Sequence, residues 1–219
     1  MSALGAVLFD MDGTLVDTEV LWWRTTEEIA DGLGHRLTDA DAPEVVGRAV
    51  EDTAAHLVRV SGGGDPYEVG AALTESFFRR VQAGAPMRPG AQRLLTALEA
   101  EGVPFALVSA SPRMVVDSVV GGSLAHVPFA FTLSADDTVR TKPHPDPYAA
   151  AAGRLGLVPQ ACVAVEDSPD GAASAEAAGC GVLVVPSLLA VPASPPRTFA
   201  ASLEDVTPAL LRGCARPPV

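Results

Sequence analysis

Short runs of apolar residues alternate with amphipathic stretches over most of the chain. The runs are uniformly apolar, which is typical of strands buried on both faces, as in a parallel sheet. They fall at residues 3–10, 103–109, 129–134, 161–167 and 181–186. Stretches with helical spacing lie between the later runs, at residues 90–102 and 146–156. This alternation predicts an α/β fold with a doubly wound, Rossmann-like parallel sheet.

The first part of the chain contains an interval with a different pattern. It holds no strand-like run, and apolar positions recur at helical spacing within residues 21–33 and 73–81. We therefore predict an all-helical cap domain of residues 18–84. This cap is inserted into an α/β core of residues 1–17 and 85–219.

Serine or aspartate directly before proline marks several expected helix starts, because the first residue caps the helix and proline suits its first turn. Asp65, Asp146, Ser111 and Ser168 stand in this position. The last two follow strand runs, so helix N-termini should gather at the carboxyl ends of the strands, where they favour an anion such as phosphate. The proline-rich segment 186–199 is expected to be a loop.

Composition and charge limit the partners. The 219 residues are 48% hydrophobic and carry a formal charge of -12, with a pI near 4.6. So acidic a chain lacks the basic face that nucleic acids or anionic membranes require. Three widely spaced cysteines fit no disulfide or zinc pattern, and we see no signal peptide or membrane span. We expect a cytoplasmic monomer that acts on a small molecule.

Acidic residues directly follow two of the predicted strands. Asp10 and Asp12 end the first run, and Glu166 and Asp167 end another. Residues two apart in extended chain point the same way, so Asp10 could attack a substrate while Asp12 handles protons. Solvated acidic turns are common, however, and a single pair of this kind is a weak signal.

Two further candidates strengthen the case. Ser109 ends the run at 103–109, and Lys142 lies between prolines that stiffen its loop. Taken singly, a serine after a strand is usually a cap, and a lysine between prolines is more often a surface residue. The four features occur in one chain, each at an expected strand end, and a chance origin of the whole set is improbable.

The motifs "FDMDGTLVDTE", "LVSAS", "KPHPDPY" and "VAVEDSPDG" resemble the four signature motifs of the haloacid dehalogenase-like (HAD) hydrolase superfamily. The resemblance covers nearly the whole chain and is strongest to the phosphatase and phosphomutase branch with a helical cap. Within that branch, the chain is similar to sugar-phosphatases of the 2-deoxyglucose-6-phosphate phosphatase type. It implies an enzyme that hydrolyses a phosphoric monoester.

The resemblance also implies catalytic roles. Asp10 would attack phosphorus and become an aspartyl-phosphate, and Asp12 would protonate the leaving alkoxide and later activate water. Ser109 and Lys142 would bind the phosphoryl oxygens. Backbone N–H groups near Met11 and Ala110 would assist them.

A magnesium site is implied by the same motifs. Mg²⁺ would be bound by the carboxylates of Asp10 and Asp167, by the backbone carbonyl of Asp12, and by Glu166 directly or through water. Oxygen ligands of this kind suit a hard, octahedral cation. The excess of negative charge explains why a cation is needed, because like charges at short range repel strongly.

Departures from related families narrow the function. Dehalogenases proper lack the second aspartate of the first motif, which is present here as Asp12. Phosphosugar mutases of this branch carry a cap histidine, and its position here holds Trp22, so a hydrolase is favoured. A mutase, or a non-catalytic binder of phosphorylated ligands, remains an alternative. Glu19 and Arg48 are the cap residues that we expect to contact the substrate.

Overall fold

The computed structural model describes residues 4–46, 48 and 50–216, and these form two compact units. One unit comprises the chain up to Val16 and from Pro86 onwards, and the other is Asp17–Ala85. Across the described residues, no helix combines the length and apolarity needed to cross a membrane.

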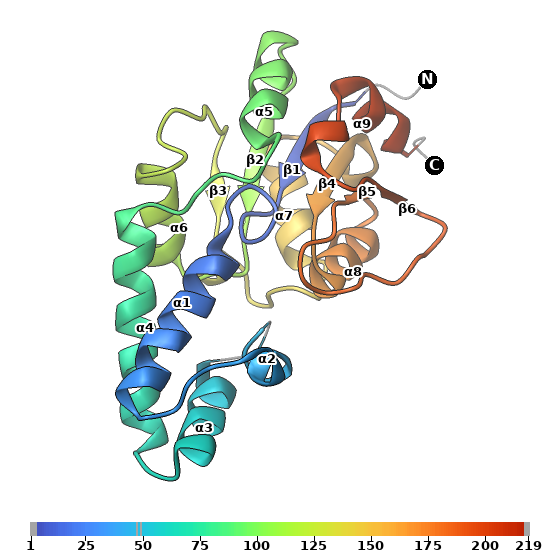
Figure 1. Cartoon of the computed structure of the whole chain (residues 1–219). Coiled ribbons are helices and arrows are strands. Elements are labelled where there is room, and N and C mark those ends of the chain that lie inside the picture. The colour runs from blue at the N-terminus through green and yellow to red at the C-terminus, as the bar shows by residue number, and fades with distance from the viewer. Residues whose placement is uncertain (1–3, 47, 49, 217–219) are drawn as a thin grey trace. The chain divides into compact units, whose positions relative to one another are not determined.

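The larger unit is built on a six-stranded sheet in which every pair of neighbouring strands is parallel (Figure 1). The spatial order is β3-β2-β1-β4-β5-β6. The strands are β1 (Ala6–Phe9), β2 (Phe105–Val108), β3 (Thr132–Leu133), β4 (Cys162–Glu166), β5 (Gly181–Val184) and β6 (Arg197–Phe199). The predicted doubly wound parallel sheet is confirmed.

The strand order reverses at β1, which has β2 on one side and β4 on the other. Phe9 at the end of β1 pairs in register with Leu107 of β2 and with Val165 of β4. The carboxyl ends of the three strands therefore lie at one edge of the sheet. In open α/β sheets, such a switch point is where ligands bind.

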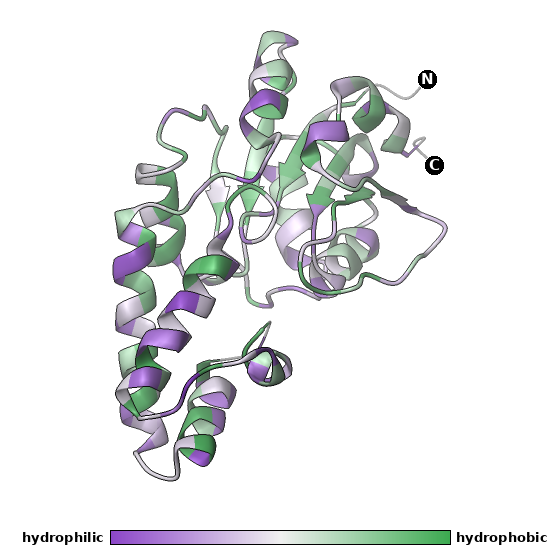
Figure 2. Cartoon of the chain, in the orientation of Figure 1, coloured by the Kyte–Doolittle hydropathy of each residue, from purple (hydrophilic) through white to green (hydrophobic). Residues whose placement is uncertain are grey.

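Helices cover both faces of this sheet. They are α5 (Ala91–Ala100), α6 (Arg113–Gly121), α7 (Asp146–Arg154), α8 (Pro169–Ala178) and α9 (Pro208–Cys214). The inward side chains of α7 and α8 form one buried apolar cluster with alternate strand residues, among them Leu8, Val108 and Ala164. Figure 2 shows the resulting pattern, with apolar strands at the centre of the unit.

The C-terminal segment differs from the prediction. The stretch expected to be a loop contains β6, which pairs with β5 from Val182 to Val184. This strand is a short, partly exposed edge strand, and its Arg197 forms an ion pair with Glu176 at 2.9 Å. Because its residues are neither uniformly apolar nor alternating, no hydrophobic run marks the strand in the sequence.

The smaller unit is helical where it is described. Its α-helices are α1 (Thr18–Gly32), α2 (Ala42–Val45), α3 (Val50–Ser61) and α4 (Pro66–Ala83), and α4 packs against α1 and α3. Asp65 caps α4 as predicted, accepting a hydrogen bond from the Tyr67 N–H at 2.8 Å. Trp22 is held inside this unit, because its indole N–H donates to the Val45 carbonyl at 3.0 Å.

Candidate active site

The chain turns sharply after β1 and brings its first two aspartates to the sheet edge. The backbone N–H of Asp10 donates to the Val165 carbonyl at 3.0 Å, which continues the pairing with β4. Gly13 follows with φ +79°, and a side chain there would collide with the Asp167 carboxylate. Glycine is therefore required both by the backbone conformation and by the close approach of the two acidic segments.

Three carboxylates meet at this edge, and we call them the acidic cluster: Asp10, Glu166 and Asp167. One oxygen from each lies within 4.8 Å of the others, and all three residues are buried. Two oxygens bound to one Mg²⁺ at ~2.1 Å are at most ~4.2 Å apart, so small rotations would let these residues share a cation. The donors are all oxygens, which suits a hard cation.

Lys142 neutralises part of this charge. Its Nζ atom donates to Asp10 Oδ1 and to Glu166 Oε1, at 2.6 Å in each case. Burial alone would lower the pKa of Lys142, but the two carboxylates raise it above its ordinary value. The ammonium group therefore stays charged and is fixed at the sheet edge.

Glu166 is held by several donors. Besides Lys142, the Tyr148 hydroxyl donates to Oε1 at 2.5 Å and the Ser168 hydroxyl donates to Oε2 at 3.2 Å. Gly171, in the first turn of α8, lets the helix come close, because a side chain there would overlap the Glu166 carboxylate. Among the described residues, these donors leave Glu166 one acceptor position, on Oε2.

The negative charge of Asp10 is stabilised by fewer hydrogen-bond donors than that of Glu166. Its Oδ2 atom is buried and has no hydrogen-bond partner among the described residues. Burial raises the pKa of Asp10 to about 7, because it and the charges of Glu166 and Asp12 outweigh the attraction of Lys142. A buried carboxylate oxygen without a partner is costly in a folded protein, and this one lies where a ligand could satisfy it.

Asp12 contacts the end of β2 through two serines. Its Oδ2 atom accepts hydrogen bonds from the Ser109 hydroxyl at 3.1 Å and from the Ser111 hydroxyl at 2.8 Å. Our expectation that Ser111 caps a helix is wrong, since α6 begins at Arg113 with Pro112 as its N-cap and no side-chain cap bond. The same expectation is wrong for Asp146, which is the first residue of α7, with Pro145 as the N-cap. Ser168 does cap α8, accepting from the Gly171 N–H at 3.1 Å.

The structure thus brings Asp10, Asp12, Ser109, Lys142, Glu166 and Asp167 together at one sheet edge. Of the backbone candidates beside them, Met11 is buried and Ala110 is exposed. The roles of all these residues remain predictions.

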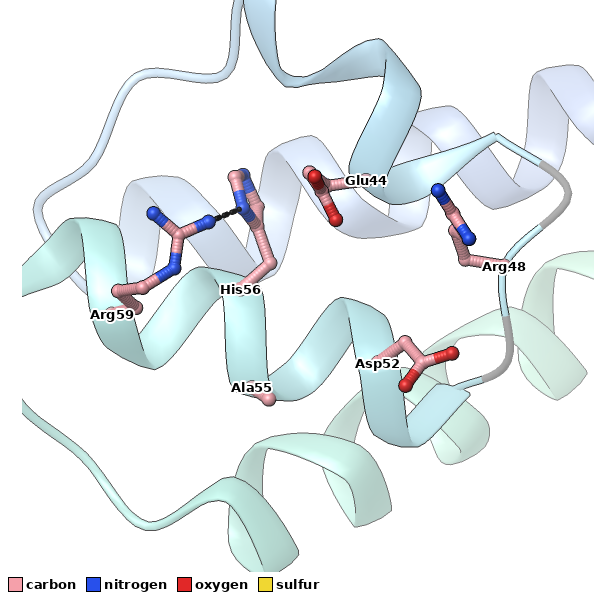
Figure 3. A pocket seen from close by; sticks show the side chains of 6 residues that line it. All are labelled: Glu44, Arg48, Asp52, Ala55, His56 and Arg59. Atoms are coloured by element: carbon pink, nitrogen blue, oxygen red, sulfur yellow. Dashed lines mark hydrogen bonds between the residues drawn. The ribbon is translucent and has the colours of Figure 1, made fainter.

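Glu19 and Arg48 lie in the smaller unit. Glu19 is in the first turn of α1, and the exposed Arg48 donates from Nε to the Pro43 carbonyl at 2.9 Å. Arg48 also lines a cavity of about 360 Å³ together with Glu44, Asp52, Ala55, His56 and Arg59 (Figure 3). The opposite charges of its lining residues offer both donors and acceptors.

A second polar cluster shares His56 and Arg59 with this cavity and includes the buried Asp41, and we call it the Asp41 cluster: Asp41, Thr38, His35, His56 and Arg59. Asp41 Oδ2 accepts from the backbone N–H and hydroxyl of Thr38, at 2.9 and 3.0 Å. Asp41 Oδ1 lies 2.8 Å from Nε2 of His56, whose Nδ1 faces an Arg59 nitrogen at 2.7 Å. Because arginine only donates, we assign His56 Nδ1 as acceptor and Nε2 as the donor to Asp41.

Two contacts at the sheet edge were missed by reasoning from the sequence. Tyr148 was not singled out, although it lies six residues after Lys142 and its hydroxyl contacts Glu166. Ser111 was assigned to a helix cap instead of to Asp12. The motif "KPHPDPY" ends on this tyrosine, so its place in the motif was the available signal.

Comparison with known protein families gives a result that agrees with this fold and with the residues at the sheet edge. The family model for haloacid dehalogenase-like hydrolases matches residues 4–179. The chain therefore belongs to this family, as predicted.

Named relatives extend along most of the chain. Hexitol phosphatase A of Escherichia coli (strain K12) is 34% identical over 202 residues, which cover 87% of this chain and 85% of that protein. A Drosophila melanogaster protein named "Probable pseudouridine-5'-phosphatase" is 34% identical over 196 residues, covering 82% and 80%. The expected enzyme class, the phosphoric monoester hydrolases, agrees with both names and is confirmed.

Solved structures are similar over the whole chain. A HAD family hydrolase from Deinococcus radiodurans R1, with bound phosphate and sodium, has a TM-score of 0.79 at 28% identity and covers 100% of both chains. The beta-phosphoglucomutase of Clostridium difficile has a TM-score of 0.69 at 18% identity and covers 97% of both chains. At that identity, the second likeness shows the fold alone.

Proposed function

We propose that this chain is a magnesium-dependent phosphatase that hydrolyses a small phosphorylated metabolite, a sugar phosphate, through an aspartyl-phosphate on Asp10. One observation carries the proposal: the buried acidic cluster at the switch point of the sheet contains a carboxylate oxygen, Asp10 Oδ2, that lacks a hydrogen-bond partner among the described residues. Such an oxygen is suited to attack a phosphorus atom or to bind a cation.

In the first step, a carboxylate oxygen of Asp10 forms a bond to phosphorus while the bond from phosphorus to the substrate oxygen breaks. The electron pair of the broken bond stays on that oxygen, which takes a proton from Asp12 and leaves as an alcohol. In the second step, Asp12 takes a proton from water, whose oxygen displaces Asp10 from phosphorus. Free phosphate and the Asp10 carboxylate result.

The remaining residues of the site bind and orient. The Lys142 ammonium, held by Asp10 and Glu166, would share its charge with phosphoryl oxygens, and the Ser109 hydroxyl would donate to one of them. Mg²⁺, when bound, would supply positive charge against the phosphoryl oxygens. Asp10, Asp167 and the Asp12 carbonyl would hold it, and the acceptor position left on Glu166 would allow contact directly or through a water molecule.

The substrate class is inferred from the relatives and from the limits of the motifs. The motifs address only the phosphate group, so selectivity must come from other residues, for which Glu19 and Arg48 of the cap remain our candidates. The related phosphatases are named for a hexitol and for pseudouridine 5'-phosphate. The hexitol name supports a phosphate ester of a polyhydroxylated carbon chain, whereas the pseudouridine name makes a nucleotide the competing substrate class.

A panel of phosphorylated metabolites tests this proposal. Release of free phosphate would be measured with and without Mg²⁺ for hexose, hexitol and pentose monophosphates, nucleotides including pseudouridine 5'-phosphate, and phosphopeptides. We expect the hexose, hexitol or pentose esters to have the highest kcat/KM. If a nucleotide or a phosphopeptide gave the highest value, the proposed substrate class would be wrong.

The same assay distinguishes the mutase alternative. A mutase would isomerise glucose 1-phosphate without releasing phosphate. Trp22 stands where mutases of this branch carry a histidine, and its indole ring packs edge-on against Phe77 at 5.5 Å. That packing gives Trp22 a structural role in the cap, which favours the hydrolase. A non-catalytic binder is disfavoured because Asp10 and Asp12 are both present.

A further inference from the structure

The hydroxyl of Ser111 lies 2.8 Å from Asp12 Oδ2, and the Ser109 hydroxyl lies 3.1 Å from the same oxygen. The Ser109 oxygen also accepts a hydrogen bond from the Ser111 backbone N–H at 2.9 Å. The two serines and Asp12 therefore form a closed hydrogen-bonded group. Since Ser111 gives α6 no cap bond, its hydroxyl is used for the contact with Asp12.

Two hydroxyl donors on one carboxylate oxygen constrain the group in two ways. They fix the plane of the carboxylate, because Oδ2 cannot turn away without losing both bonds. Before substrate binds they also occupy the lone pairs of Oδ2, so a proton on Asp12 then belongs on Oδ1. A general acid works only when its proton points at the leaving oxygen, which makes this orientation part of the chemistry.

The two serines differ in what else they must do. In the proposed function, Ser109 donates its hydroxyl proton to a phosphoryl oxygen when substrate binds. A hydroxyl has one proton to donate, so Ser109 would then release Asp12. Ser111 would keep its bond to Oδ2 during phosphoryl transfer.

We infer that Ser111 is a positioning residue that holds Asp12 in the orientation of a general acid. This inference rests on the proposed function and adds to it a residue that lies outside the roles assigned above. Ser111 acts through Asp12 and has no assigned contact with the reacting atoms.

Leaving-group dependence tests this role. The kcat/KM of Ser111→Ala would be measured with the preferred sugar phosphate and with p-nitrophenyl phosphate, whose leaving group departs without a proton. General acids contribute about 10²- to 10⁴-fold, so we expect kcat/KM for the sugar phosphate to fall by about ten- to a hundredfold. For the aryl ester we expect a change of less than about threefold, because no acid is needed there.

Three variants serve as controls. Ser111→Thr keeps the hydroxyl and should restore most of the lost activity on the sugar phosphate. Asp12→Asn should show the same selectivity for the leaving group with a larger effect. Ser202→Ala removes a serine that caps a short turn elsewhere, bonded to the Glu204 N–H at 3.1 Å, and should leave both substrates unaffected.

The outcomes separate this inference from the proposed function. Equal losses on both substrates, or no loss on the sugar phosphate, would overturn the positioning role even if Asp12→Asn behaves as expected. If Asp12→Asn itself hydrolysed the sugar phosphate at the wild-type rate, the proposed function would fail together with the inference. Thermal unfolding of each variant would show whether a loss comes from misfolding, in which case Ser111→Thr decides.

Discussion

The acidic cluster of the larger unit and the Asp41 cluster of the smaller unit both hold buried carboxylates, but these carboxylates are compensated to different degrees. Asp41 is 6% exposed, and both of its oxygens accept hydrogen bonds from Thr38 and His56. Asp10 is equally buried at 6%, yet one of its oxygens has no hydrogen-bond partner among the described residues. The two side chains are equally hidden from solvent, but Asp10 lies deeper in the protein and has fewer donors than Asp41.

The pKa values of the two aspartates differ in the same sense. For both, burial acts to raise the pKa. At Asp41 the hydrogen bonds from Thr38 and His56 outweigh burial, and the pKa falls to about 2. At Asp10 burial and two neighbouring carboxylates prevail over Lys142, and the pKa rises to about 7. A compensated cluster stabilises its fold, whereas an uncompensated one stores unfavourable charge and is a candidate functional site.

Asp10→Asn tests the contrast between the two clusters with the largest expected effect. Loss of the nucleophile is expected to lower kcat by at least about a thousandfold, while the free energy of unfolding without metal stays unchanged or rises. Stability should not fall, because a carboxylate with a raised pKa is destabilising in its charged form at neutral pH. Phosphate release and thermal unfolding would be measured on one preparation. A kcat within about tenfold of wild type would remove Asp10 from the role of nucleophile.

Removal of metal should have the next largest effect. We expect EDTA to lower activity by at least about a hundredfold, and added Mg²⁺ to restore it. Mg²⁺ should also raise the unfolding temperature of the wild type, because a ligand that binds only the folded state stabilises that state. At a free Mg²⁺ concentration of a hundred times Kd, the free energy of unfolding rises by ~2.7 kcal/mol.

Asp167→Asn is the matched variant for this measurement. It should need more Mg²⁺ for the same rise in unfolding temperature, since one ligand of the proposed site is weakened. Full activity in metal-free buffer would contradict the assignment of Asp167.

The sequence predicts those parts of the fold and site that depend on local pattern. Uniform apolar runs identify five of the six strands, and the acidic residues stand directly after two of them, so their meeting at one sheet edge follows from a parallel arrangement. Ser168 and Asp65 cap helices as their place before proline indicates.

Features that depend on tertiary contacts could not be predicted in this way. Ser111 and Asp12 are 99 residues apart, and the same Ser-Pro pattern that caps α8 gives no cap bond at α6, because the Ser111 hydroxyl donates to Asp12. The strand β6 exists because β5 offers a free edge to pair with, a property of the folded sheet that its own three residues do not encode.

The smallest expected effect is on the stability of the cap, and it tests the compensated member of the pair, Asp41. Asp41→Asn should lower the free energy of unfolding at pH 7 by about 1–2 kcal/mol, because it removes a negative charge that hydrogen bonds from Thr38 and His56 stabilise in the folded state. The folded pKa of Asp41, about 2, lies below the ordinary value of 3.8. The contribution of the Asp41 carboxylate to the free energy of unfolding is therefore complete above about pH 4 and is lost as the pH falls towards 2.

Urea unfolding at several pH values, followed by tryptophan fluorescence, measures this effect in the cap itself. Both tryptophans of the chain, Trp22 and Trp23, lie in α1. The difference between wild type and Asp41→Asn should shrink as the pH is lowered from 5 to 2. Asp39→Asn, an exposed neighbour in the same turn, should change little at any pH. A difference that stays constant with pH would mean that Asp41 stabilises the cap by shape alone, and the contrast with Asp10 would then not be one of charge compensation.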